Sequence, residues 1–180
     1  GKSFLSRLFV PLKKVGRVVF GDTQKIIRSG NWHGNDTCWR MVMDLNKCLF
    51  HFDGAGQPRQ KPIRYLAVVD GIIAGEGNGP MAPDPKPCGL IIAGQNPLAV
   101  DATCAQLMGF DWQKIRMLRG AFAITRKSIA AFSRNEIHIT SSDPRWNRAL
   151  KDLSPTDHFA FKPHLGWVGA VELNAPPERQ

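Results

Sequence analysis

The feature that most constrains the fold is a pair of short apolar runs on either side of a stretch rich in glycine and proline. Residues 64–70 and 90–94 contain β-branched residues and are bounded by turn-forming residues, a pattern typical of buried strands. Directly after the second run, Asn96 and Pro97 predict a helix start, and Gly109 predicts its end. The central part of the chain therefore predicts two strands followed by a helix.

The rest of the chain adds weaker elements of both kinds. Apolar residues at helical spacing predict a helix over residues 35–50. Shorter patterns predict helical segments over 111–118, 124–132 and 143–153, and strands over 15–20 and 137–140. Because strands that alternate with helices form covered sheets, we predict an α/β fold with a mixed or mostly parallel sheet and helices packed on it.

Length and composition indicate one folded unit. The chain has 180 residues, 43% of them hydrophobic, which suits a single domain over 1–180 with its own core. Residues 155–180 form a weakly patterned tail, and the initial glycine suggests a piece of a longer protein. No apolar run reaches the length of about 18 residues expected of a membrane-spanning helix.

The cysteines indicate a reducing compartment. Cys38, Cys48, Cys88 and Cys104 show no close metal-ligand spacing, so we interpret them as reduced thiols of a cytoplasmic protein. No iron–sulphur cluster of the ferredoxin type is expected, because such clusters need grouped cysteine ligands. The identity of any other cofactor stays open.

The chain is strongly basic. Its formal net charge is +9 and its pI is about 9.8. Such a charge attracts anions, including phosphorylated small molecules and nucleic acid. The lysines and arginines are spread over folded elements rather than grouped in one block, so the charge permits nucleic-acid binding without favouring it.

Residues 70–80 carry the best candidate site. Asp70 follows a predicted strand, and ligands of open α/β sheets bind beyond the carboxyl ends of strands. Glu76 lies in the stretch and Asp84 follows it, so the three carboxylates could hold a divalent cation. The stretch also supplies flexible backbone for ligand binding at Gly75, Gly77, Asn78 and Gly79. The alternative is a long turn whose acidic side chains cap backbone amides.

Two further regions are candidates. Asp101, near the start of a predicted helix, is expected at the same sheet edge as Asp70, although the helix dipole alone could explain an acidic residue there. We therefore consider Asp70, Glu76, Asp101 and His33 as acid–base candidates. The glycine-flanked loop before residue 37 adds the ligand contacts Trp32, Asn35, Asp36 and Arg40, of which Arg40 suits an anionic substrate. A solvated row of salt bridges is the alternative for Asp36 and Arg40.

The combination of motifs resembles a known family. Residues 65–115 are similar to the bacterial and archaeal family called domain of unknown function number 362, and residues 30–47 resemble one of its subgroups. The matching pieces include Asp70-Gly71, the run from Glu76 to Pro80, Asn96-Pro97 with Asp101, and Met108-Gly109-Phe110-Asp111. Many relatives carry or accompany ferredoxin-type iron–sulphur modules. The resemblance implies a functional role for residues 70–80 but no particular reaction, and this chain lacks the cysteine cluster.

Three functions remain in competition. The first is ligand or divalent-metal binding, with or without catalysis, at residues 70–80. The second is a module that binds nucleic acid or another polyanion. The third is a non-catalytic partner domain of a redox complex. The oligomeric state and the substrate stay open.

Overall fold

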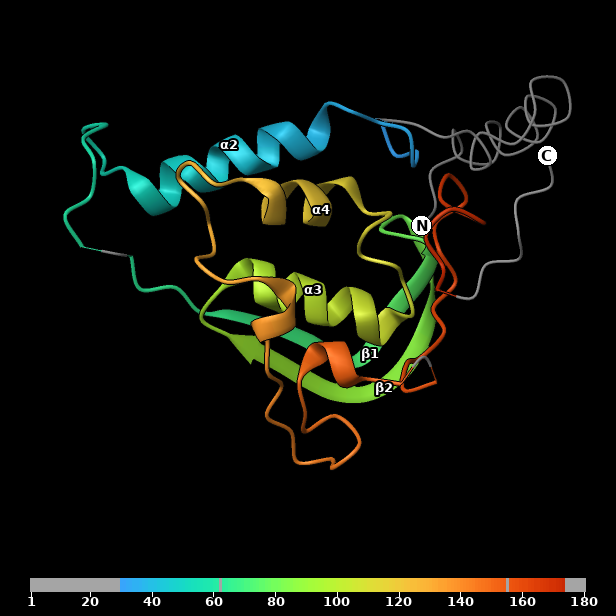
Figure 1. The fold of residues 1–180 in the computed structure, drawn as a ribbon. Helices are drawn as coiled ribbons and strands as arrows, with labels where there is room; N and C mark the ends of the chain where they lie inside the picture. The colour runs from blue at the N-terminus through green and yellow to red at the C-terminus, as the bar shows by residue number, and fades with distance from the viewer. Residues whose placement is uncertain (1–29, 62, 155, 174–180) are drawn as a thin grey trace, which may run out of the picture.

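The computed structural model describes residues 30–61, 63–154 and 156–173. Its elements are α2 (Cys38–His51), β1 (Ala67–Asn78), β2 (Ala82–Gly94), α3 (Pro97–Met108), α4 (Arg116–Ala123) and the short 3-10 helices η2 (Arg134–Glu136) and η3 (Leu150–Asp152). Figure 1 shows α3 between the β1–β2 hairpin and α4, with α2 on the far side of α4. The fold is a mixed α/β fold.

The sheet differs from the prediction of a mixed or mostly parallel one. In the described part of the chain, the sheet consists of β1 and β2, which pair antiparallel. Both strands extend into the stretch that we interpreted as a loop, so that residues 79–81 alone connect them. A parallel pair needs a crossover of about a dozen residues, and no residues are left for one.

Alternating prolines explain how such a sequence forms a strand. Pro83, Pro85 and Pro87 occupy every second position of β2. Because alternate residues of a strand point their backbone N–H positions to the same side, the three missing donors lie on one edge. Gly77 is paired with Pro83, and its N–H donates to the Lys162 carbonyl instead of to β2. The Pro83 nitrogen therefore also points away from β1, and the intervening residues of β2 supply the donors that face β1.

The ladder between the two strands shifts by one residue. Gly71 lies opposite Leu90 but Ile73 lies opposite Pro87, which leaves two residues of β2 opposite Ile72. One of them, Gly89, has a φ of +66°, a left-handed conformation that glycine adopts without strain. The buried positions of β1 change at this bulge, from odd-numbered residues before it to even-numbered residues after it.

Helix α3 forms as its sequence predicts. The Asn96 side chain accepts hydrogen bonds from the backbone N–H groups of Leu98 and Ala99 at 3.0 and 3.2 Å. Gly109 ends the helix with a φ of +86°. Six of its twelve residues are buried, and two of these, Ala102 and Leu107, share a core cluster with side chains of β2. Helix α3 is therefore the central element of the core.

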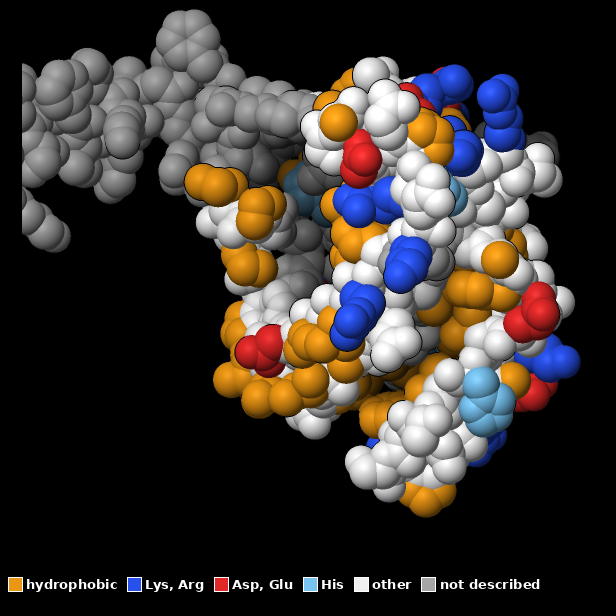
Figure 2. Space-filling view, turned by 90° about the vertical axis from the view of Figure 1, so that its left-hand side faces the viewer, with side chains coloured by type: hydrophobic (Ala, Val, Ile, Leu, Met, Phe, Trp, Pro, Cys, Tyr) orange, Lys and Arg blue, Asp and Glu red, His pale blue; other side chains and the backbone are white. Residues whose placement is uncertain are grey.

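The outward face of the hairpin stays apolar. Leu66, Val68, Ile73 and Ile91 are each more than half exposed. Figure 2 looks onto the end of the molecule at which β1 begins and β2 ends, and hydrophobic side chains gather on the lower part of that face. Among the described residues, these side chains have no covering layer.

The chain after α3 departs from several predictions. The predicted helix over 111–118 is shifted, since α4 begins at Arg116. No helix forms over 124–132, and the predicted strand over 137–140 makes one isolated bridge, between His138 and Ala149. Instead of a helix over 143–153, Asp143 caps a turn by accepting a hydrogen bond from the Arg145 N–H, and η3 follows. The predicted strand over 15–20 lies outside the described residues.

Helix α2 confirms the predicted helix over 35–50, with a start three residues later. The Asn35 side chain accepts hydrogen bonds at 3.0 Å from the N–H groups of Thr37 and Cys38, which satisfies two donors at the start of the helix. In the described ranges, no helix combines the length and apolar character needed to span a membrane.

Candidate functional site

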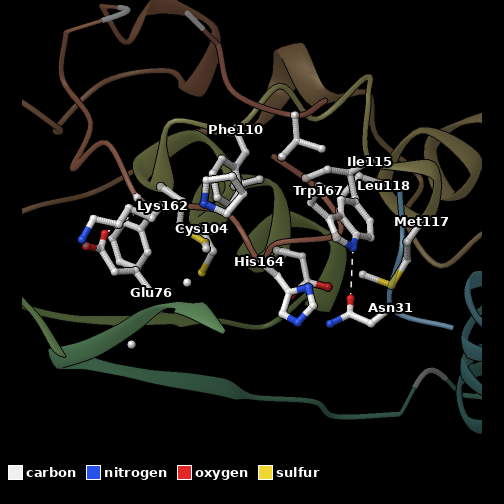
Figure 3. Close-up of a pocket in the computed structure, with 18 residues that line it drawn as sticks. Asn31, Glu76, Cys104, Phe110, Ile115, Met117, Leu118, Lys162, His164 and Trp167 are labelled. Atoms are coloured by element: carbon white, nitrogen blue, oxygen red, sulfur yellow. Dashed lines mark hydrogen bonds and ion pairs between the residues drawn. The ribbon is translucent and has the colours of Figure 1, made fainter. Parts of the chain in front are cut away.

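A cavity of about 390 Å³ lies where the tip of β1 meets α3 and the C-terminal segment 161–167 (Figure 3). We call it the hairpin-tip cavity. Its polar lining residues include Asn31, Glu76, Asp101, Cys104, Lys162 and His164, and its remaining lining residues are Gly75, Gly77, Ala105, Met108, Phe110, Ile115, Met117, Leu118, Phe161, Pro163, Trp167 and Val171. The cavity is therefore mostly apolar, with polar groups contributed by four separate parts of the chain.

Glu76 is buried beside two lysines. It is 7% exposed, and its carboxylate oxygens lie 3.2 Å from Lys86 Nζ and 3.4 Å from Lys162 Nζ. Burial by itself would raise the pKa of Glu76, but the hydrogen bond from the Lys162 backbone N–H and the two ammonium groups outweigh it, so the pKa is lowered. Glu76 is therefore held as a charged, ion-paired carboxylate.

The C-terminal segment is joined to the hairpin by backbone hydrogen bonds. The Lys162 N–H donates to Glu76 Oε2 at 3.0 Å, and the Gly77 N–H donates to the Lys162 carbonyl at 2.9 Å. The Leu165 N–H donates to Asn78 Oδ1 at 3.4 Å. Residues 76–78 thus hold the segment that forms one wall of the hairpin-tip cavity.

Helix α3 contributes Asp101 and Cys104 to the cavity. Asp101 is exposed as a residue, yet the protein atoms around its carboxyl group displace enough water to raise its pKa. Burial, together with the nearby Asp101 charge, raises the pKa of the Cys104 thiol to about 11. Cys104 is therefore a neutral thiol at pH 7 rather than a reactive thiolate.

His164 and Trp167 form the wall opposite α3. His164 Nδ1 accepts a hydrogen bond from the Gly166 N–H at 3.1 Å, so the neutral ring carries its proton on Nε2. The Trp167 indole N–H donates to Asn31 Oδ1 at 3.0 Å (Figure 3). This bond joins the chain before α2 to the C-terminal segment across 136 residues of sequence.

Asp70 and Asp84 lie outside the hairpin-tip cavity. Asp70 is exposed, accepts a hydrogen bond from the Ile72 N–H at 3.0 Å and borders a different cavity of about 200 Å³. Asp84 is 68% exposed and lies 3.7 Å from Lys162 Nζ. Within the described ranges, no three His, Cys, Asp or Glu side chains are grouped so that they could hold a metal ion. Glu76 and Asp84 lie opposite each other on β1 and β2 and share Lys162, but Asp70 lies apart from them, so the three carboxylates do not converge.

The predicted site residues on the loop before α2 contact other parts of the fold. His33 Nε2 lies 2.9 Å from the Lys114 carbonyl, and the ring packs edge-on against Trp167 with 5.5 Å between centroids. Asp36 accepts hydrogen bonds from Trp39, Arg40 and Arg116. These contacts attach the loop to α4 and to the C-terminal segment. Asp36 and Arg40 also form an exposed salt bridge at 2.7 Å, the kind of contact that the alternative interpretation expects. Exposed Trp32 does not line the hairpin-tip cavity, nor does Gly79 at the hairpin turn.

Sequence reasoning missed the contribution of Cys104, Lys162, His164 and Trp167 to this cavity. Cys104 stands one helical turn after Asp101, at the i+3 spacing that places both on one face, so the sequence did contain a signal for it. The other three belong to the weakly patterned tail, where no periodicity indicated a site. Their role depends on contacts with residues more than 80 positions earlier.

Fold and site together define a mixed α/β domain with a cavity of the size of a small organic molecule. The chain belongs to the family described as domain of unknown function (DUF362), whose model matches residues 17–106. The match spans half of the chain and includes the hairpin and most of α3. No curated protein and no solved structure gives a significant match to this chain.

Proposed function

We propose that this protein binds a small, largely apolar organic molecule in the hairpin-tip cavity. Glu76 of β1 and Asp101 of α3 line the same cavity, although they belong to separate candidate regions of the sequence. This convergence is the observation that carries the proposal. A volume of about 390 Å³ falls in the range of small-molecule sites, roughly 300–1,000 Å³. Apolar walls with a few polar groups are also typical of such sites.

For acid–base chemistry on a bound molecule, Asp101 is the candidate that we retain. Its raised pKa and its position in the cavity suit proton transfer. Glu76 is ion-paired, and the His33 ring nitrogen is bound to the Lys114 carbonyl. Asp70 lies outside the cavity. The divalent-cation prediction has less support, because its three carboxylates do not converge.

Among the described residues, the arrangement of charges gives the polyanion alternative less support. Six of the basic side chains are already ion-paired with carboxylates: Arg40, Lys47, Lys86, Arg116, Arg145 and Lys162. A partner-domain role is favoured by one observation, the exposed apolar face of the hairpin. Sedimentation equilibrium of the wild type and of Ile73→Ser tests it, since loss of an association in the variant would place the interface on that face.

The binding proposal is tested by nuclear magnetic resonance on the full chain with a panel of small aromatic compounds. Binding should shift the Trp167 indole N–H signal and the amide signals of Asp101 and Cys104. Trp167→Ala removes a cavity wall and should weaken binding, whereas Trp32→Ala, an exposed tryptophan outside the cavity, should not. Shifts that gather elsewhere, or equal binding by both variants, would contradict the proposal.

A further inference from the structure

Among the described residues, the charged side chains that line the hairpin-tip cavity are ion-paired except at one residue. Glu76 is paired with both Lys86 and Lys162, and Lys162 also lies 3.7 Å from Asp84. Two carboxylates and two ammonium groups therefore form a cluster whose formal charges sum to zero. A molecule in the cavity meets little net charge from this cluster.

Asp101 carries the remaining charge. Among the described residues, no lysine or arginine forms an ion pair with the Asp101 carboxylate, which lines the cavity. The adjacent Cys104 thiol is uncharged at pH 7, because its pKa is raised to about 11. An unbalanced carboxylate on the wall of a mostly apolar cavity attracts a cation more strongly than it would in open water, because the surrounding apolar atoms screen it less.

We propose that the ligand of the hairpin-tip cavity is a ring-containing organic cation, an inference that rests on the proposed function. Its protonated amine or amidinium group would lie beside Asp101, and its apolar body would lie among the aromatic side chains. The rings of Phe110, Phe161 and Trp167 line the cavity. Aromatic walls accept planar groups and add attraction for a cation over a ring face.

This charge pattern disfavours an anionic ligand, although the whole chain is basic. The lysine that lines the cavity, Lys162, already lies within 3.7 Å of two carboxylates. Its ammonium group would have to leave Glu76, which is 7% exposed, to reach an anion. An anion near Asp101 would also meet a like charge without a counter-charge.

Three probes that share one ring system separate the effect of charge from that of shape. Tryptamine, indole and indole-3-acetate carry charges of about +1, 0 and −1 at pH 7, as expected of an alkyl amine, a neutral ring and a carboxylate. Their dissociation constants for the full chain are measured by isothermal titration calorimetry at low and high salt. We expect tryptamine to bind about fivefold more tightly than indole, the ratio that a partly exposed ion pair of roughly 1 kcal/mol produces.

Two variants locate the effect. Asp101→Asn should reduce the preference for tryptamine over indole to about onefold. Asp44→Asn removes one carboxylate from an exposed position on α2, so it makes the same change in net charge and should keep the preference. Melting curves of both variants confirm that each is folded.

The outcomes separate this inference from the proposed function. Equal binding of all three probes, or tightest binding of indole-3-acetate, would contradict the cation inference and leave a cavity that binds small molecules. A tryptamine preference that survives in Asp101→Asn would also contradict it. Binding of none of the three would count against the proposed function itself.

Discussion

Asp70 and Glu76 lie on opposite faces of β1, although both stand at even-numbered positions of one strand. The buried positions of β1 change between them, where the ladder shifts by one residue between Gly71 and Ile73. Before the shift, Asp70 is exposed, and after it Glu76 is 7% exposed. In an unbroken strand, side chains six residues apart would share a face. The bulge therefore separates the two carboxylates that a shared cation site would need.

Replacement of Glu76 by Gln should destabilise the protein by about 1–3 kcal/mol at pH 7, because two lysines lose a buried counter-charge. The folded-state pKa of Glu76 is lowered below its ordinary value of 4.5. Its stabilising contribution is therefore present above pH 4.5 and is lost as the pH falls through the folded-state pKa. Urea unfolding at pH 7 and in acid measures both effects. Asp84→Asn, at a 68% exposed carboxylate, is the control and should change the free energy of unfolding by less than about 0.5 kcal/mol.

Replacement of Gly89 by Ala should cost roughly 1–2 kcal/mol, because the bulge requires a φ of +66° that a residue with a Cβ adopts only under strain. No atom lies within 4 Å of the added Cβ, so a steric clash would not contribute. Gly54→Ala, where space is also open and no positive φ is recorded, is the matched control. Equal melting temperatures for the two variants would contradict a strained position at the bulge.

The pKa of Asp36 should be about 2, below its ordinary value of 3.8. The hydrogen bond from the Trp39 indole is the largest cause, followed by the one from Arg40, and Arg116 adds a smaller effect. Carbon-detected magnetic resonance of the carboxyl group during an acid titration measures it. Trp39→Phe should raise the pKa of Asp36 more than Arg116→Gln does, and the reverse order would contradict this arrangement.

Alkylation should distinguish the cysteines. Cys38 and Cys48 are exposed, whereas partly buried Cys104 has a pKa raised to about 11. Iodoacetamide at pH 8 should therefore modify Cys38 and Cys48 faster than Cys104, since the thiolate is the reactive form. Mass spectrometry of peptides reports each site. Rapid modification of Cys104 would show that its environment stabilises the thiolate. Tryptamine at saturating concentration should slow its modification at high pH.

The elements that depend on local interactions could be predicted from the sequence. The start and end of α3 follow from Asn96, Pro97 and Gly109, since caps act on backbone groups within a few residues. Helix α2 follows from apolar periodicity and the Asn35 cap. Glu76 and Asp101 could also be chosen as candidate site residues from the sequence, because an acidic residue near glycines or near a helix start is recognisable without any tertiary contact.

The way in which these elements pack together depends on tertiary contacts. A strand pattern does not reveal its partner, so the antiparallel pairing of β1 with β2 and its bulge depend on contacts between the two strands. The position of residues 161–167 depends on the bond between Lys162 and Glu76, which are 86 residues apart. Such contacts form when distant segments bury apolar surface together, and this burial is a property of the whole packed core rather than of any local run of residues.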